Sequence, residues 1–379
     1  IDIDVFQTNS KKVLDIVKAG RELPWVAVRS SATAEDLPSI SEDEYVFVKL
    51  NNKPFFGKMK ELASTVKPED EVFVPAMDNF EIEWKKVSNI YKHKADHKEL
   101  VRITTSTGKQ ITISPNHTLI VLDNDTLQPK VIELAELKGN EKIPTIKTIP
   151  LEADLDSIDV LNYISQDGVI EHNNKLMIKN NSSNWKIQQG LPKKILINKD
   201  LAYFLGLYTA EGTTYKSSII ITNSEVKMID RIRSFISALG INSKNKINKS
   251  SLRVYCKTLV RLLNENCSIP NEKIKGKGRT CRTKEVPSFI FSCSKEIIGE
   301  YLKGCFDGDG SVEKNAVSYS STSEKLIAGI STLLQLLSIE HYIRKKKNSS
   351  EIYLPLKELI SFRNKVGFSH IKKADRLDV

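Results

Sequence analysis

The chain has 379 residues, enough for two or three domains that each have a core of their own. Its formal net charge of +10 favours a polyanionic partner, nucleic acid first, although a general bias toward lysine explains the charge as well. No apolar run reaches the roughly 18 residues of a membrane span, and the start of the chain does not resemble a signal peptide. We therefore expect no membrane association and a cytoplasmic location.

The cysteines and histidines predict neither a disulfide framework nor a metal cluster. Five cysteines lie 11 to 14 residues apart without a CxxC pair: Cys256, Cys267, Cys281, Cys293 and Cys305. Their odd number argues against disulfides and their spacing against a zinc knuckle, so we expect reduced, mostly buried thiols. His93 and His97 could share a helix face, but no third ligand lies nearby, so surface polarity is the simpler interpretation.

Residues 1–38 differ in character from the rest of the chain. NSKKVLDIVKAG predicts a helix and PWVAV an apolar strand, and the polar loop RSSATAEDLP follows. Four side chains of this loop are candidate phosphate partners: Arg29, Ser30, Ser31 and Thr33. A capped loop is an equally good interpretation of them.

The segment VAVRSSATAEDLP resembles the nucleotide-binding domain of phosphoenolpyruvate synthase and of its relative pyruvate phosphate dikinase. The resemblance implies that Arg29 contacts a nucleotide phosphate, with ATP needed only by the complete host enzyme. The match ends abruptly before Ser39, so residues 1–38 are expected to be a fragment of such a host.

Two middle regions follow. Residues 39–150 read as an all-β unit, because short alternating runs such as EYVFVKL, DEVFVPAM and TLIVLD are separated by turns such as NNKP and STGK. The TGK turn between VRITTS and QITIS is the strongest hairpin signal. Residues 151–198 are mixed and rich in asparagine, and we expect a linker with some helix around 157–165.

The most informative feature is a pattern that occurs twice, as FLGLYTAEG at 204–212 and as LKGCFDGDG at 302–310. Its acids, Glu211 and Asp309, lie 98 positions apart. Each copy leads into a strand, an amphipathic helix with a serine N-cap (Ser224, Ser323) and basic strands. The repeat predicts two αββα halves within 199–379, the first at 199–290 and the second at 291–379.

Small residues four apart in each copy let two helices approach closely: Gly206 and Ala210, and Gly304 and Gly308. We expect Gly212 and Gly310 to stop these helices in a left-handed turn. The two acids would then meet at the helix ends, where they are electrostatically disfavoured. Bound Mg²⁺, held by the acids and by backbone carbonyls near both glycines, would relieve that penalty. The alternative is a pair of helix-terminal acids in a purely structural repeat.

FLGLYTAEG and LKGCFDGDG resemble the two motifs of the LAGLIDADG (DOD-type) homing endonucleases. The resemblance implies a pseudo-symmetric monomer that binds double-stranded DNA and hydrolyses phosphodiesters with metal held by Glu211 and Asp309. Thr209 and Asp307 match the earlier acid position. Two lysines are candidate assisting cations, namely Lys284 and, in the second half, Lys346 or a neighbour.

The segment SISEDEYVFV, which begins at Ser39, and GKQITISPNH resemble the first two splicing blocks of an intein. The resemblance implies a Hint-type domain in which Ser39 is the nucleophile, His117 polarises the scissile amide and Ser114 supports it. Most inteins begin with cysteine. The expected ending, His-Asn before a nucleophile, does not occur at ADRLDV, and His172-Asn173 precedes no nucleophile, so this chain by itself is not expected to complete splicing.

We therefore expect an α+β chain with a β-rich Hint-type splicing domain and a LAGLIDADG endonuclease domain, inserted between host extein segments. Its target would be the intein-free host allele. One alternative is the activity of the host, phosphoenolpyruvate synthase, an ATP-dependent phosphotransferase. The other is a catalytically dead, DNA-binding LAGLIDADG protein.

Overall fold

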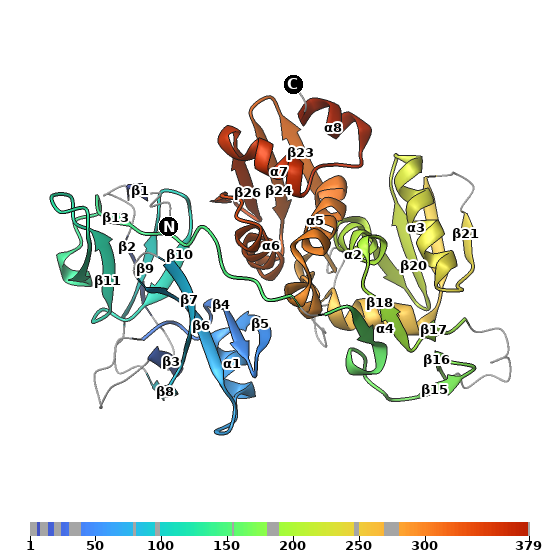
Figure 1. Cartoon of the computed structure of the whole chain (residues 1–379), viewed down its shortest axis with the longest axis horizontal. Helices are drawn as coiled ribbons and strands as arrows, with labels where there is room; N and C mark the ends of the chain where they lie inside the picture. The colour runs from blue at the N-terminus through green and yellow to red at the C-terminus, as the bar shows by residue number, and fades with distance from the viewer. Residues whose placement is uncertain are drawn as a thin grey trace. The chain divides into compact units, whose positions relative to one another are not determined.

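The computed structural model describes residues 6–7, 14–18, 24–29, 39–78, 81–94, 99–153, 155–179, 189–245, 250–268 and 280–377 (Figure 1). The chain divides into two compact units, one of residues 1–150 with 340–345 and one of residues 151–339 with 346–379. No helix in the described part is long and apolar enough to cross a membrane. The cysteines are free thiols, and all except Cys281 are buried, as predicted.

The first unit consists mostly of antiparallel strands. These are β1 (Phe6–Gln7), β2 (Leu14–Lys18), β3 (Pro24–Arg29), β4 (Tyr45–Leu50), β5 (Lys53–Lys58), β6 (Val72–Asp78), β7 (Glu81–Lys86), β8 (Asn89–Lys94), β9 (Glu99–Thr104), β10 (Gln110–Ile113), β11 (Thr118–Leu122), β12 (Pro129–Glu133) and β13 (Lys142–Ile143). They pair in the orders β1-β13-β11-β12, β10-β9-β2, β3-β8 and β5-β4-β6-β7. The strand β25 (Tyr342–Lys345), which belongs to the second repeat in sequence, is grouped with this unit. The sequence predicts most of these strands but misses the helix α1 (Met59–Thr65) and the 3₁₀ turn η1 (Leu134–Glu136).

The N-terminal strands belong to the sheets of this unit. The helix predicted from NSKKVLDIVKAG is wrong at its centre, because Leu14–Lys18 is the strand β2, paired with β9. Its branched side chains Ile16 and Val17 suit a strand, and pairing overrides the weak helical pattern. The strand predicted from PWVAV is confirmed as β3.

Several of the predicted residues cannot be placed. Ser30, Ser31, Thr33 and His97 lie outside the described residues, as do the side chains of Arg29 and His93.

Two hairpin turns follow the sequence closely. Asn51 and Asn52 connect β4 to β5 with φ angles of 50° and 62°, and two left-handed residues in a row make a type I′ turn. Gly108 has φ +77° in the predicted TGK turn between β9 and β10. Both turns fix the register of the strands that they join.

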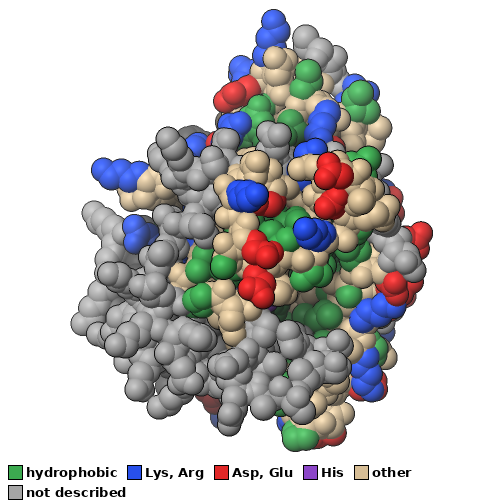
Figure 2. Space-filling model, turned by 90° about the vertical axis from the view of Figure 1, so that its left-hand side faces the viewer, with side chains coloured by type: hydrophobic (Ala, Val, Ile, Leu, Met, Phe, Trp, Pro, Cys, Tyr) green, Lys and Arg blue, Asp and Glu red, His purple; other side chains and the backbone are tan. Residues whose placement is uncertain are grey.

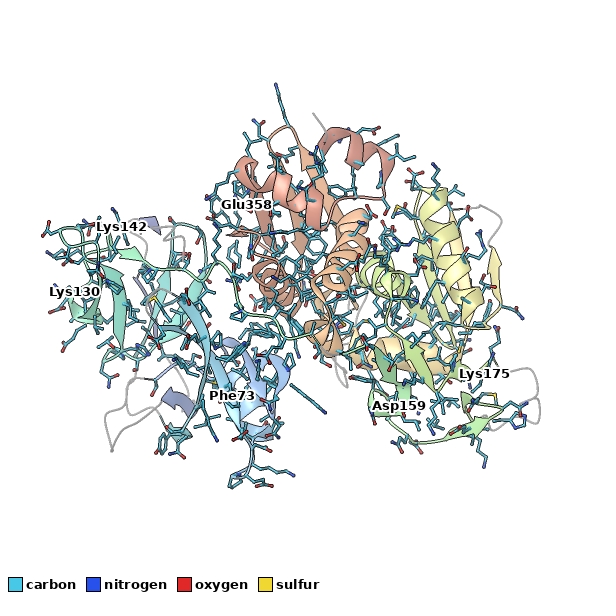
Figure 3. All side chains as sticks on the ribbon, in the orientation of Figure 1. Phe73, Lys130, Lys142, Asp159, Lys175 and Glu358 are labelled. Atoms are coloured by element: carbon cyan, nitrogen blue, oxygen red, sulfur yellow. The ribbon has the colours of Figure 1, made fainter. Side chains whose placement is uncertain are left out.

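The segment 151–198 is more ordered than a linker. It carries β14 (Ser157–Asp159), η2 (Val160–Asn162), β15 (Val169–His172), β16 (Lys175–Ile178), β17 (Leu191–Pro192) and β18 (Lys194–Leu196). The helix expected around 157–165 is only the 3₁₀ turn η2. Lys175, which Figure 3 labels, donates from its Nζ to the carbonyl oxygen of Gly240 at 3.0 Å. The buried Thr258 hydroxyl donates to Leu176 O at 2.9 Å. This segment therefore packs on the first repeat. His172 and Asn173 lie at its β15–β16 hairpin, where Asn173 has φ 49°.

The two repeats share one order of elements. The first has α2 (Lys199–Glu211), β19 (Thr213–Tyr215), β20 (Ser218–Thr222), α3 (Val226–Ala238), β21 (Ser243–Asn245), β22 (Ser251–Tyr255) and α4 (Lys257–Asn266). The second has α5 (Lys295–Asp309), β23 (Gly310–Glu313), β24 (Ala316–Ser321), α6 (Glu324–Leu336), then β25, β26 (Ser350–Pro355), α7 (Leu359–Lys365) and α8 (Ile371–Leu377). Short 3₁₀ turns are η4 (Thr280–Arg282), η5 (Ser288–Ser292) and η6 (Leu356–Glu358). Each half is therefore αββαββα, with α8 as an additional helix in the second half. The predicted αββα order missed the short strand after each motif and the closing helix.

The core of this second unit lies between helices and sheets. The strands pair as β19-β20-β22-β21 in the first half, and β23, β24 and β26 are consecutive neighbours in the second. Each sheet buries alternate residues, such as Ile219 and Ile221 of β20, whereas the residues between them are more exposed. The helices α2 and α5 lie side by side at the centre (Figure 1).

The predicted helix caps are half right. Ser323 Oγ accepts the N–H of Leu326 at the start of α6, as expected. Ser224 does not cap α3, whose N-cap is Glu225, and Asn223 Oδ1 accepts the Glu225 N–H at 2.8 Å instead.

The charge on the surface is mixed where it can be seen. In Figure 2, blue and red side chains alternate around apolar ones on the face shown, without a field of one sign. Among the predicted basic strands, Lys346 and Lys347 are exposed, whereas the side chains at 244–249 of the first half lie outside the described residues.

Candidate functional site

Helices α2 and α5 approach each other so closely that only glycine fits at their crossing. A Cβ atom at Gly206 would lie 2.0 Å from the carbonyl oxygen of Tyr301. The equivalent atom at Gly304, 98 positions later, would lie 2.4 Å from the carbonyl oxygen of Tyr203. Side-chain atoms do not tolerate such distances, so the missing Cβ atoms permit the contact. The contact is reciprocal between the two repeats, as the spacing of the small residues predicts.

Glu211 and Asp309 are the last residues of these helices and meet at one end of the pair. A Cβ atom at Gly308 would lie 2.5 Å from Ala210 Cβ and 3.1 Å from Glu211 Cγ, so the Glu211 side chain lies against α5 immediately before Asp309. Burial raises the pKa of Glu211, and the charge of Asp309 raises it further. One acidic centre is thus assembled from both repeats.

Two half-buried lysines complete the electrostatics of this acidic centre. Burial raises the pKa of Asp309 above the usual carboxyl range, and the positive charges of Lys284 and Lys373 lower the pKa of both acids. Burial also lowers the pKa of each lysine. Acids and bases whose pKa values are displaced in this way and that share one centre are typical of functional sites.

Each lysine donates to the C-terminal carbonyl groups of one helix. Lys284 Nζ lies 2.7 Å from Ala210 O at the end of α2. Lys373 Nζ, from α8, donates to three carbonyl oxygens near the end of α5: Phe306 (3.0 Å), Asp307 (2.6 Å) and Gly308 (3.1 Å). A cation at a helix C-terminus is stabilised by the partial negative charge there. The two lysines are therefore equivalent in position, one for each repeat.

The counterpart of Lys284 differs from the one expected from the sequence. Lys346 is exposed and pairs with Glu351 at 2.7 Å, so the structure does not bring it to the centre. Lys373 lies there instead. It lies 64 residues beyond Asp309 in a short polar helix, and no motif marks it.

The glycines after the acids are needed because no side chain fits at these positions, not because the backbone there is left-handed. Gly212 has φ −72° and ψ 146°, and Gly310 has φ −75° and ψ 150°, so the predicted left-handed turn is wrong. A Cβ atom at Gly212 would lie 2.1 Å from Tyr208 Cδ2, and one at Gly310 would lie 2.4 Å from Phe306 O. The chain leaves each helix extended and folded tightly over the last turn, and only glycine has room there.

Asn223 is a further residue of the centre that the sequence does not mark. Its side-chain nitrogen lies 3.0 Å from both carboxylate oxygens of Glu211. Thr322 occupies the matching place in the second half and is exposed. No described residue donates a hydrogen bond to the Asp309 carboxylate in the way that Asn223 donates to Glu211. The acidic centre is therefore less symmetric than the helix pair.

The earlier acid positions of the motifs lie inside the protein. Thr209 and Asp307 are each only 1 % exposed. Tyr203 OH donates to Asp307 Oδ2 at 2.8 Å, and Tyr301 OH donates to Thr209 Oγ1 at 3.2 Å, so each pair crosses between α2 and α5. These residues tie the helices together.

The donor set of the acidic centre fits a hard divalent cation. Glu211 and Asp309 offer carboxylate oxygens, the ligands that Mg²⁺ prefers. A bound cation would offset the loss of solvation that disfavours the ionised form of both acids. The described residues contain no cluster of three His, Cys, Asp or Glu side chains, so water and substrate oxygens would have to complete the coordination. Near the expected carbonyl ligands at Gly212 and Gly310, the carbonyl oxygens of Ala210 and Gly308, two residues earlier, accept hydrogen bonds from the two lysines.

A second group of predicted residues meets in the first unit. The backbone N–H of Ser39 donates to Ser114 Oγ at 2.9 Å, and Ser114 N–H donates back to Ser39 O at 2.9 Å. The Ser114 hydroxyl donates to Asn116 Oδ1 at 2.5 Å. Ser39 and Ser114 are buried, whereas His117 is half-buried and its Nδ1 lies 2.6 Å from Thr118 O. The structure thus brings Ser39 and Ser114 together, and the backbone N–H of His117 donates to Ser114 O at 3.1 Å.

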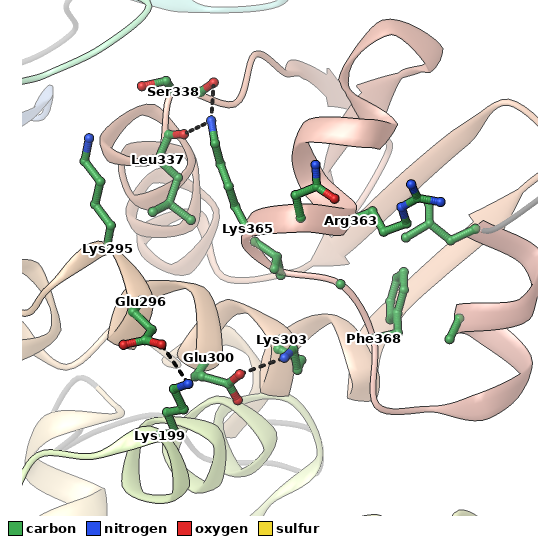
Figure 4. Close-up of a pocket in the computed structure, with 15 residues that line it drawn as sticks. Lys199, Lys295, Glu296, Glu300, Lys303, Leu337, Ser338, Arg363, Lys365 and Phe368 are labelled. Carbon is green, nitrogen blue, oxygen red and sulfur yellow. Dashed lines mark hydrogen bonds and ion pairs between the residues drawn. The ribbon is translucent and has the colours of Figure 1, made fainter.

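A pocket of about 640 Å³ lies toward the opposite end of the helix pair (Figure 4). Residues of α2 and α5, the two residues after α6, the end of α7 with the loop that follows it, and α8 line this pocket. Its charges are largely paired. Lys199 bonds Glu296 at 2.7 Å, Lys303 bonds Glu300 at 2.7 Å, and Lys365 donates to Leu337 O at 2.7 Å. Neither Glu211 nor Asp309 lines this pocket, so it is separate from the acidic centre.

Comparison with known families agrees with the doubled motif. Residues 198–269 and 296–368 each match the family model described as LAGLIDADG-like domain. The chain therefore contains two copies of this domain, and each copy includes one helix of the central pair.

Two curated relatives come from Methanocaldococcus jannaschii. "DNA-directed RNA polymerase subunit Rpo1C" is 29% identical over 318 residues, which are 81% of this chain and 35% of that protein. "Replication factor C small subunit" is 24% identical over 334 residues, which are 80% of this chain and 16% of that protein. The chain thus spans about a third or less of the length of either relative.

Among solved structures, "The crystal structure of I-DmoI in complex with DNA and Mn" aligns over 45% of this chain and 96% of that chain, with 16% identity and a TM-score of 0.32.

Proposed function

We propose that the second unit is a site-specific endonuclease that cuts both strands of DNA with the help of a divalent cation, Mg²⁺ in the cell. The observation that carries the proposal is the meeting of Glu211 and Asp309 at one end of the close pair of helices from the two LAGLIDADG-like copies. A purely structural repeat does not need two carboxylates with raised pKa values at one end of a helix pair, beside two half-buried lysines.

The residues of the acidic centre suit phosphodiester hydrolysis. A bound divalent cation supplies Lewis-acid chemistry, lowering the pKa of water and stabilising the leaving oxygen. Glu211 and Asp309 hold the cation when ionised. Lys284 and Lys373, whose charges act on both acids, would offset the negative charge that a phosphate bound there gains in the transition state. Each repeat contributes one acid and one lysine, so one chain can act on both strands as a monomer.

Double-stranded DNA is the proposed substrate because of the net charge of +10 and the exposed lysines after the second-half helix α6. The proposed target is the uninterrupted host gene, in which the codons for EDLP are followed directly by further host sequence. An insertion that begins at Ser39 interrupts that site. Residues 1–38 resemble phosphoenolpyruvate synthase, which is the host that we propose.

We also propose that the first unit carries out the first step of protein splicing, a Hint-type function. The supporting observation is the Ser39 N–H donated to Ser114 Oγ, because this N–H belongs to the peptide bond that would break. Ser39 Oγ would attack the preceding carbonyl carbon, forming an ester as the C–N bond breaks, and the released amine would take a proton. The two relatives, whose names are unrelated to each other, share a segment with this chain, and a mobile insertion would leave such a pattern.

A plasmid that carries the uninterrupted host junction tests the nuclease. We expect Mg²⁺ to support its conversion to a linear form, and EDTA to prevent it. Glu211→Gln and Asp309→Asn are expected to abolish cutting while DNA binding remains. If the wild-type chain binds this plasmid tightly but leaves the circle intact, the protein is a DNA-binding relative without nuclease activity.

A further inference from the structure

Asp307 joins three elements of the second unit, although it faces away from the acidic centre. Its carboxylate accepts the N–H groups of Ser369 (2.9 and 3.1 Å to its two oxygens) and His370 (3.0 Å), which directly precede α8. It also accepts the Tyr203 hydroxyl hydrogen from α2 at 2.8 Å. With 1 % exposure, Asp307 has no solvent to replace these partners if they are lost.

The backbone that Asp307 holds is the first turn of the helix that carries Lys373. His370 O accepts the N–H of Lys373 (3.0 Å) and of Ala374 (2.9 Å), so this turn starts at a residue held by Asp307. Lys373 then reaches back to α5, and the shortest of its three bonds, 2.6 Å, is to the carbonyl oxygen of Asp307 itself. Asp307 thus binds the segment 369–373 at two points. Its carboxylate accepts the backbone N–H groups of Ser369 and His370, and its carbonyl oxygen accepts a hydrogen bond from Lys373 Nζ.

Lys284 of the first half is held in a different way. Ser268 and Lys284 form an antiparallel bridge, and Glu285 N–H donates to Cys267 O at 3.0 Å. Ser323 Oγ also donates to Lys284 O at 2.5 Å. Thr209, which stands where Asp307 stands in the other repeat, donates to Leu205 O within its own helix at 2.8 Å. The backbone and α6, rather than a motif side chain, therefore position Lys284.

We propose that Asp307 is a positioning residue for Lys373 and that its loss affects the half of the acidic centre that carries Lys373 more than the other half. This inference rests on the proposed nuclease function. Thr209 and Asp307 stand at the same motif position, 98 residues apart, and have different roles. Asp307 is required to position Lys373, whereas Thr209 is not required to position Lys284.

Strand-specific cutting tests the proposal. Asp307→Asn replaces one acceptor oxygen by a donor that faces backbone N–H groups, and we expect it to slow cutting of one strand about 10- to 100-fold, as the loss of a supporting residue commonly does. The nicked circle should then accumulate, because the other strand is still cut. Tyr203→Phe removes a single hydrogen bond to Asp307 and should give a weaker effect on the same strand. Thr209→Val is the matched control: it removes the buried acceptor of the Tyr301 hydroxyl between the two helices, so any slowing should fall on both strands alike. Equal slowing of both strands by Asp307→Asn would overturn the proposal.

A double-variant comparison shows whether Asp307 acts through Lys373. Lys373→Met should reproduce the strand preference of Asp307→Asn, and Asp307→Asn should add nothing in the Lys373→Met background. Additive losses would contradict the proposal. Hydrogen exchange of the full chain gives a readout that needs no nuclease activity: the amides of residues 369–377 should exchange faster in Asp307→Asn, with the rest of α5 unchanged. If the wild-type chain cuts no DNA, the proposed function fails, and hydrogen exchange still decides whether Asp307 holds α8.

Discussion

The side-chain amide of Asn223 lies 3.0 Å from both carboxylate oxygens of Glu211, and the second repeat has the exposed Thr322 in its place. A donated hydrogen bond favours the ionised carboxylate, so Asn223 lowers the pKa of Glu211 against the upward effect of burial. Asp309 has one side-chain carbon fewer and no such partner among the described residues. The two halves of the centre therefore hold their acids by different means, although the helices beneath them are related by a regular offset of 98 residues.

Replacing Asn223 by alanine is expected to weaken metal binding at the first half. Without the amide, the pKa of Glu211 rises further, and the carboxylate also loses its fixed orientation. We expect the Mg²⁺ concentration that gives half-maximal cutting to rise about 10- to 100-fold, as for other residues that orient a metal ligand. A titration of the cutting rate with Mg²⁺ measures the change. Thr322→Ala is the matched control in the other repeat, and an equal shift in that variant would contradict the asymmetry.

Neutralising an acid of the centre is expected to stabilise the metal-free protein above neutral pH. The pKa of Glu211 is raised in the folded state, so its ionisation lowers stability as pH rises through that value, whereas below the ordinary carboxyl pKa the acid is protonated in both states. In EDTA, Glu211→Gln should melt a few degrees higher than wild type near pH 8 and at the same temperature near pH 4. Added Mg²⁺ should raise the melting temperature of wild type more than that of the variant. A lower melting temperature of Glu211→Gln near pH 8 would show that the carboxylate is stabilising.

The sequence predicts the helix pair and its acids because these features are local and repeated. The spacing of Gly206 and Gly304 is enough to predict their role, since two helices that meet at such residues can approach closely. Lys373 and Asn223 carry no such signal, because the chain path between them and the acids decides whether they arrive at the centre. The same reason explains Gly212, whose conformation depends on where the next strand goes. At Leu14–Lys18, pairing with β9 decides the secondary structure.

The helix crossing should not tolerate even one methyl group. In Gly304→Ala, the new Cβ atom would lie 2.4 Å from Tyr203 O and 2.7 Å from Leu207 N, so the helices must separate. We expect a loss of about 1–3 kcal/mol in the free energy of unfolding, as for other overpacked cores. Denaturant unfolding followed by circular dichroism measures it. Ser234→Ala on the exposed side of α3 is the control and should change stability by less than about 0.5 kcal/mol. Unchanged stability of Gly304→Ala would mean that the helices lie farther apart than described.

Replacing a lysine at the acidic centre should lower the cutting rate, whereas replacing one away from it should lower only the affinity for DNA. Lys284→Met removes a half-buried cation whose charge acts on Asp309, so the cutting rate at saturating DNA should fall about 10²-fold while binding is kept. Lys346→Met removes an exposed lysine paired with Glu351, so it should change only the affinity and its salt dependence. Single-turnover cutting and filter binding at several salt concentrations separate the two effects. A large loss of the cutting rate in Lys346→Met would show that Lys346 acts at the acidic centre.

Breaking the chain chemically before Ser39 tests the first unit without DNA. If the acyl group shifts to the Ser39 hydroxyl, the ester is open to hydroxylamine, and the full chain should yield a fragment that ends at Pro38. Ser39→Cys should give more of this fragment, now also with a thiol reagent, because a thiolate is the better nucleophile at neutral pH. Ser114→Ala removes the acceptor of the Ser39 N–H and the hydroxyl that can return a proton to the departing nitrogen, so the yield should fall about 10²-fold. Ser41→Ala, two residues from the bond and buried to a similar degree, should leave the yield unchanged. Mass spectrometry of the fragments identifies the bond, and an intact chain in both wild type and Ser39→Cys would refute the splicing role of this unit, because the more reactive thiol excludes a merely slow nucleophile.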